Sequence, residues 1–156
     1  MGYDILNEVE YNSVWNRFYS QFMFKPDYHE RLRPAIHEPV PSIVYRFKDE
    51  VLDQDIEELD ASFRRCFAEI AQQGRLMYAL DWQHESYRFD PNSDWSDLPI
   101  GVFPDGDYYI FLTDDFTCGT FGHPWQGSLC VFGERLISLL ELDRPAILES
   151  VLRANT

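Results

Sequence analysis

Apolar residues recur at intervals of three and four in two long segments of the chain. In the first segment, 9–23, the recurring residues are Val14, Trp15, Phe18, Tyr19 and Phe22. In the second segment, 53–73, they are Ile56, Leu59, Phe63, Phe67 and Ile70. Because this spacing places side chains on one side of a helix, each segment is predicted to form an amphipathic helix. The candidates for the capping residues are Asn12 or Ser13 for the first helix and Asp53 or Asp55 for the second.

Six shorter runs carry the alternation or the apolar character of strands. They are 42–48, 76–80, 85–89, 108–113, 116–121 and 128–132. The runs 76–80 and 85–89 flank a four-residue turn, which predicts that they pair with each other. The run 108–113 is apolar at both alternating sets of positions, as expected of a central strand that is covered on both faces. Gly119 and Gly122 indicate close backbone approach or a bulge in or beside their strand.

The last part of the chain returns to a helical pattern. A helix is predicted from Gly133, and Pro145 suits the first turn of a second short helix that carries Ile147, Leu148, Val151 and Leu152. The complete pattern predicts a single α+β domain over residues 1–156. Its core is a mainly antiparallel sheet of about five or six strands, packed with helices at the N-terminus, in the middle and at the C-terminus.

The segment 25–41 contains four prolines and is therefore predicted to be an extended loop that wraps around the domain. It also holds the one concentration of positive charge in the sequence, formed by His29, Arg31, Arg33 and His37. Pairing with nearby acidic residues is the favoured interpretation of this cluster. Contact with a ligand anion is the alternative.

The chain has 13 basic and 27 acidic residues, a formal net charge of −14. This balance argues against nucleic acid and anionic membranes as partners. Nine carboxylates lie between Asp81 and Asp115, where Arg88 is the single basic residue besides a histidine. Such a surface would accelerate encounter with a basic protein partner. Solubility alone is the simpler explanation of the charge.

The sequence predicts a cytoplasmic protein. Three cysteines without CxxC spacing indicate neither a disulfide framework nor a thiolate zinc site, which suits a reducing compartment. The N-terminal residues resemble no secretory signal, and no run approaches the roughly 18 apolar residues of a membrane span.

Residues suited to proton or metal chemistry gather in two phrases, DWQHE at 81–85 and FGHPW at 121–125. If these segments meet, His84, Glu85 and His123, with Asp81, would form a metal site of two histidines and one carboxylate. The spacing matches no diagnostic metal, nucleotide or hydrolase motif, so structural use of the same residues is favoured. No cofactor is indicated.

Large aromatic residues with polar groups are interleaved with the acidic residues of this part of the chain. Such surfaces anchor protein interfaces, although core packing of the rings is the simpler alternative. The candidate binding residues are Asp81, Trp82, His84, Glu85, Trp95, Asp105, Asp107, His123 and Trp125. For Trp95 the sequence leaves two positions open, a lid over the core or a contact surface.

The phrases ALDWQHESYRFDP and VFPDGDYYIFLTDDFTCGTFGHPW resemble a family of uncharacterised bacterial proteins, domain of unknown function 2716. The resemblance implies no activity and no site residues. The leading functional hypothesis is therefore a non-catalytic protein-binding domain, with an immunity-type inhibitor of a basic toxin or enzyme as one form of it. The alternatives are a metal-dependent or hydrolytic enzyme that uses His84, Glu85 and His123, and a small-molecule binder with a pocket between the proline-rich segment and the sheet.

Overall fold

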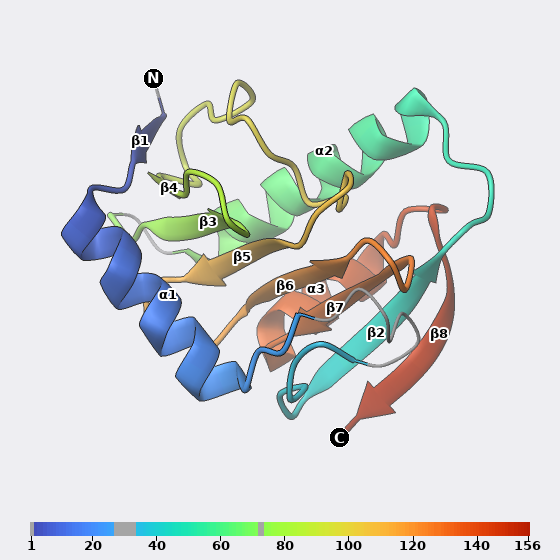
Figure 1. The fold of residues 1–156 in the computed structure, drawn as a ribbon. Helices are drawn as coiled ribbons and strands as arrows, with labels where there is room; N and C mark the ends of the chain where they lie inside the picture. Colours follow the sequence, from blue (N-terminus) through green and yellow to red (C-terminus); the bar gives the residue numbers. More distant parts are fainter. Residues whose placement is uncertain (1, 27–33, 72–73) are drawn as a thin grey trace.

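The computed structural model describes residues 2–26, 34–71 and 74–156, which contain eight strands and three helices (Figure 1). The strands are β1 (Tyr3–Ile5), β2 (Ser42–Phe47), β3 (Met77–Asp81), β4 (Tyr87–Phe89), β5 (Tyr109–Thr113), β6 (Gly119–His123), β7 (Ser128–Phe132) and β8 (Leu148–Asn155). The helices are α1 (Glu8–Phe22), α2 (Asp53–Ile70) and α3 (Glu134–Leu142). All eight strands belong to one sheet in the order β1-β4-β3-β5-β6-β7-β2-β8, and every neighbouring pair is antiparallel.

The helices cover opposite faces of this sheet. Helix α1 lies across one face, and α2 and α3 lie on the other (Figure 1). Each face has its own core. Phe18 and Phe22 of α1 pack on the first face, and Phe63 and Phe67 of α2 pack on the second. The periodic apolar positions of the two predicted helices are therefore the positions that bury these faces.

Strand β5 lies fourth of eight in the sheet and is buried on both faces, as its pattern predicted. Phe111 belongs to the core beneath α2, whereas Ile110 and Leu112 belong to the core beneath α1. The predicted pairing of the two strands around Asp81–Glu85 is also confirmed, since β3 and β4 are antiparallel neighbours. Close approach at Gly119 is confirmed as well, because a Cβ atom there would lie 1.9 Å from the carbonyl oxygen of Phe111.

The α+β class is confirmed, but the predicted number of five or six strands was too low. The two unpredicted strands, β1 and β8, form the edges of the sheet. Three residues are too few for β1 to show a period. The predicted second C-terminal helix is wrong, because residues Leu148–Asn155 pair along β2 instead. Pairing with β2 provides hydrogen-bond partners for the backbone of this segment, and it forms although Val151 and Leu152 remain exposed in β8.

The predicted capping residues of both helices need correction, although α2 begins at Asp53 as predicted. Helix α1 begins four or five residues before the predicted caps, and Asn7 Oδ1 accepts a hydrogen bond of 2.9 Å from the amide of Glu10. Helix α2 has Leu52 as its N-cap residue. Asp55 is the third residue of that helix, and its carboxylate accepts a hydrogen bond of 2.8 Å from the amide of Leu52.

Part of the proline-rich segment closes the core beneath α1. Ala35 and Ile36 are buried there, and Glu38 binds Arg153 of β8 through contacts of 2.7 and 3.1 Å. The predicted cationic residues His29, Arg31 and Arg33 lie outside the described residues. Within the described ranges, no helix combines the length and the apolar character that crossing a membrane requires.

Candidate functional site

Antiparallel pairing of β3 with β5 brings two predicted site residues together at one end of the sheet. Asp81 is the last residue of β3 and lies opposite Tyr109, the first residue of β5. Asp107 comes two residues before Tyr109, after the turn that contains Asp105 and Gly106. The turn after β3 and the turn before β5 therefore meet, although more than 20 residues separate them in the sequence.

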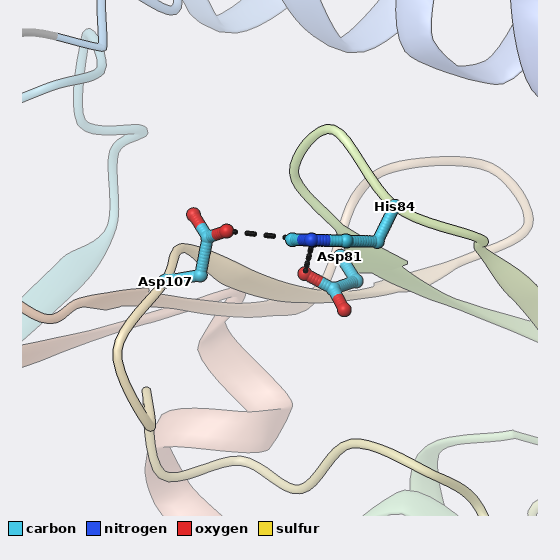
Figure 2. A group of neighbouring side chains, drawn as sticks. All are labelled: Asp81, His84 and Asp107. Carbon is cyan, nitrogen blue, oxygen red and sulfur yellow. Dashed lines mark hydrogen bonds and ion pairs between the residues drawn. The ribbon is translucent and has the colours of Figure 1, made fainter.

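The side chain of His84 lies between these two carboxylates (Figure 2). Its Nδ1 atom is 3.1 Å from Asp81 Oδ1 and 3.5 Å from Asp107 Oδ2. Both carboxylates are largely covered, with 15% and 19% of their side-chain surface exposed, whereas 63% of the His84 side chain is exposed. The imidazole is thus the exposed member of the group, and the two carboxylates are mostly buried.

Local backbone structure orients these groups. The amide of His84 donates a hydrogen bond of 3.1 Å to the carbonyl oxygen of Asp81, which closes a tight turn after β3. Gln83 in this turn has a φ of 67°. Asp107 Oδ1 accepts a hydrogen bond of 2.8 Å from the amide of Tyr108, so the other carboxylate oxygen is turned toward His84.

The electrostatics of the site are dominated by negative charge. Burial raises the pKa values of the Asp81 and Asp107 carboxyl groups above the usual range. The hydrogen bond and the charge of Asp81 raise the pKa of His84. Burial, followed by the charges of Asp81, Asp105 and Asp107, raises the pKa of Tyr109 to about 12. Negative potential therefore extends across the end of β5.

The counter-charge at this site differs from the counter-charges elsewhere. Among the ion pairs of the described residues, the other carboxylates are bound by Arg or Lys. Examples are Arg88 with Glu10, Arg153 with Glu38 and Lys48 with Asp55. Asp81 and Asp107 are bound by a histidine, which is positively charged only when protonated. The positive charge beside these two carboxylates therefore depends on pH, unlike the charge in the other pairs.

An open groove of about 560 Å³ lies beside the site, between the N-terminal segment and the turn after β3. Its apolar part includes Ile5, Tyr11 and Tyr87. Its polar part includes Glu8, Glu85, Asp81 and His84. The groove therefore combines an apolar wall with an acidic rim.

His123 and Glu85 have other surroundings. His123 is 2% exposed within β6, and its ring packs near Tyr108 and Phe121 at centroid distances of 5.1 and 6.3 Å. Its Nδ1 atom accepts a hydrogen bond of 3.1 Å from the amide of Gln126. Glu85 is exposed on the turn after β3. Within the described residues, the group whose ligand atoms converge is Asp81, His84 and Asp107, without either of these two.

The predicted aromatic binding residues mostly belong to the core. Trp95 is 4% exposed and packs against Phe89 and Phe111, so its ring belongs to the core beneath α2. Trp82 is buried, and its indole N–H donates a hydrogen bond of 3.0 Å to Tyr19. Trp125 is partly buried beside Tyr108. His84, Glu85 and Asp105 are exposed, so these three residues form the accessible part of the predicted site.

Comparison with known proteins agrees with the resemblance found in the sequence. The family model described as "Protein of unknown function (DUF2716)" matches residues 5–137, and the chain belongs to this family. The chain is also similar to the uncharacterised protein YxiI of Bacillus subtilis (strain 168). The two are 28% identical over 163 residues, which cover 94% of this chain and 97% of that protein. No solved structure is significantly similar to the chain.

Proposed function

We propose that this protein is a non-catalytic binding domain that recognises a basic protein through the acidic surface formed by Asp81, Glu85, Asp105 and Asp107. The observation that carries the proposal is the pair of covered carboxylates at Asp81 and Asp107, whose described counter-charge is the imidazole of His84. A lysine or arginine from a partner would provide the permanent positive charge that this site lacks.

The groove beside the site suits such a side chain. Lysine and arginine have an aliphatic stem and a charged end. The stem would lie against Ile5, Tyr11 and Tyr87, and the charged end would reach the rim at Asp81 and Glu85. The net charge of −14 would add long-range attraction and increase the association rate.

An immunity-type inhibitor of a basic toxin or enzyme is the form of this function that we favour. Such an inhibitor acts by covering the basic surface with which its target works, and it needs no catalytic group of its own. The support is the acidity of the chain together with the exposed Glu85 and Asp105 beside the site at one end of the sheet.

The decisive experiment is capture of a binding partner followed by quantitative titration. The tagged protein is used to isolate basic proteins from cells that encode it, and the dissociation constant of the captured protein is measured for the wild type and Asp107→Asn. We expect binding at least about tenfold weaker for the variant, because a charged pair at an interface is lost. Raising the salt concentration should also lower the affinity of the wild-type complex.

The control variant is Asp97→Asn, which removes one negative charge from an exposed loop outside the candidate site. It should change the affinity by less than about twofold through long-range charge alone. Equal losses for both variants, or a complex that is insensitive to salt, would contradict recognition at this site.

The two alternative functions receive less support from the described residues. The cavity between Pro34, Ile36 and strand residues including Cys130 has a volume of about 10 Å³, which is too small for a metabolite. For the enzyme hypothesis, Glu85 and His123 do not join His84 in the converging group. We therefore propose neither alternative.

A further inference from the structure

We infer that Asp81, His84 and Asp107 form a binding site for a divalent transition-metal ion, with Zn²⁺ as the best-fitting ion. This inference concerns the same end of the sheet as the proposed protein-binding surface, but it does not require a protein partner. It differs from the metal site predicted from the sequence, because two aspartates replace Glu85 and His123 as ligands.

The distances between the three side chains support the inference. Each residue offers a ligand atom, and these atoms lie within 4.8 Å of one another. Zinc binds nitrogen and carboxylate oxygen at about 2.1 Å, so two ligands of one tetrahedral ion lie roughly 3.4 Å apart. The His84 nitrogen is 3.1 Å from the Asp81 oxygen and 3.5 Å from the Asp107 oxygen. Small side-chain movements would therefore allow all three to coordinate.

The backbone positions of the three ligands hold them close together before an ion binds. Asp81 is held at the end of β3 by pairing with β5. The amide of Tyr108 binds one oxygen of Asp107, which leaves the other oxygen for coordination. His84 is carried by the short turn after β3, and its side chain lies close to both carboxylates (Figure 2). One strand end and two adjoining turns thus hold the three ligands, and ligand order lowers the entropic cost of binding.

The chemistry of the ligands selects the type of ion. Calcium and magnesium prefer sites made of oxygen atoms, whereas an imidazole nitrogen with carboxylates suits zinc and related transition metals. Three protein ligands leave one tetrahedral position for water or for a group in the neighbouring groove. A divalent ion would also neutralise two covered carboxylates that now share one imidazole. It would thereby compete with a basic partner for this surface.

The test is titration of the purified full-length chain with Zn²⁺ alone, monitored by calorimetry and by equilibrium dialysis. We expect one ion per chain at this site, with at least about tenfold weaker binding after His84→Gln or Asp107→Asn. Substitution of Co²⁺ for Zn²⁺ provides a second measurement, because its visible spectrum reports the coordination. That spectrum should change in both variants. Thermal unfolding of each variant confirms that it is folded.

The matched control is Asp105→Asn. It removes the same charge two residues from Asp107, from a side chain that is outside the converging group. Its zinc affinity should stay within about twofold of the wild type. An affinity that His84→Gln and Asp107→Asn leave unchanged would overturn the inference. An equal loss of zinc affinity in Asp105→Asn would also overturn it, and so would displacement of zinc by equimolar Mg²⁺. Either result would indicate general attraction of cations to negative charge.

The outcomes of the two experiments are independent. Zinc binding with no basic partner would support the metal site and count against the proposed protein-binding function. A basic partner with no zinc binding would do the opposite. If both occur, zinc should release the partner from the wild type.

Discussion

Asp115, in the turn between β5 and β6, shows how one carboxylate organises its neighbours. Its Oδ1 atom accepts hydrogen bonds of 2.8 Å from the hydroxyl groups of both Thr113 and Thr117. Arg75 lies 3.1 Å from its other oxygen. Burial by itself raises the pKa of Asp115, but these hydrogen bonds outweigh burial and hold the pKa well below the usual range. The ionised form therefore stabilises the turn.

Asp115→Asn should reduce the free energy of unfolding by about 1 kcal/mol at neutral pH, because the hydrogen bonds lose their ionised acceptor. The expected loss is small because 45% of the Asp115 side chain is exposed, and solvent screens its charge. A carboxylate with a lowered pKa stabilises the fold above its ordinary pKa and loses this contribution as the pH falls. The free energies of unfolding of the wild type and the variant, measured with urea, should therefore become more similar below about pH 4.

The matched control for this prediction is Asp114→Asn. Asp114 also binds Arg75, but the threonine hydrogen bonds belong to Asp115. At neutral pH, Asp114→Asn should lower the free energy of unfolding by less than Asp115→Asn does. If the free energies of unfolding of the wild type and Asp115→Asn differ by the same amount at neutral and acidic pH, the ionised carboxylate is not the source of the stabilisation.

At the scale of elements, the edge strand β8 is fastened at two levels. Its backbone pairs with β2, although the pairing shifts register between Val44 and Tyr45. Its Arg153 binds Glu38 of the proline-rich segment, and the two side chains are 30% and 10% exposed. Asn155 also donates a hydrogen bond of 3.0 Å to Glu38. One covered carboxylate therefore connects the last strand to the segment that closes the core beneath α1.

Glu38→Gln should destabilise the protein by about 2 kcal/mol, because Arg153 would keep its charge without an ionised partner in a partly covered position. Amide hydrogen exchange should show the largest loss of protection in β8. The comparison variant is Asp49→Asn, which breaks the exposed pair with Arg46. That change should cost less than about 1 kcal/mol. Equal destabilisation by both substitutions would show that the Glu38 contacts have no special role.

At the scale of the whole molecule, the net charge of −14 acts against folding. Acidic residues repel one another more strongly in the compact state than in the unfolded chain. The local ion pairs offset only part of this repulsion, since the chain has 27 acidic and 13 basic residues. Salt should therefore stabilise the fold while it weakens binding of a basic partner.

The midpoint of thermal unfolding should rise by several degrees when NaCl is increased from about 20 mM to about 500 mM, because screening reduces the repulsion. Scanning calorimetry in NaCl and in KCl separates general screening from binding of a specific cation. Both salts should give the same shift. A midpoint that falls with salt would mean that attractive ion pairs, rather than net repulsion, dominate the electrostatic free energy.

The sequence by itself determined the elements whose side chains are buried periodically. The two long helices, the doubly covered β5 and the close approach at Gly119 all follow from local spacing, because burial requires a regular apolar pattern. Strands β1 and β8 lack such a pattern, since an edge strand gains its stability from backbone pairing with a distant partner. Their assignment needed the tertiary structure.

For the candidate site, too, the sequence predicted one part and the tertiary structure decided the other. Asp81, His84 and Asp107 were each predicted as binding residues from their chemistry, but their convergence was not predicted. It depends on the antiparallel register of β3 with β5, which places Asp81 opposite Tyr109. The burial of Trp95 and the enclosure of His123 likewise depend on long-range packing. Residue chemistry is local and can be read from the sequence, whereas the grouping of distant side chains was decided by strand pairing and by packing between elements.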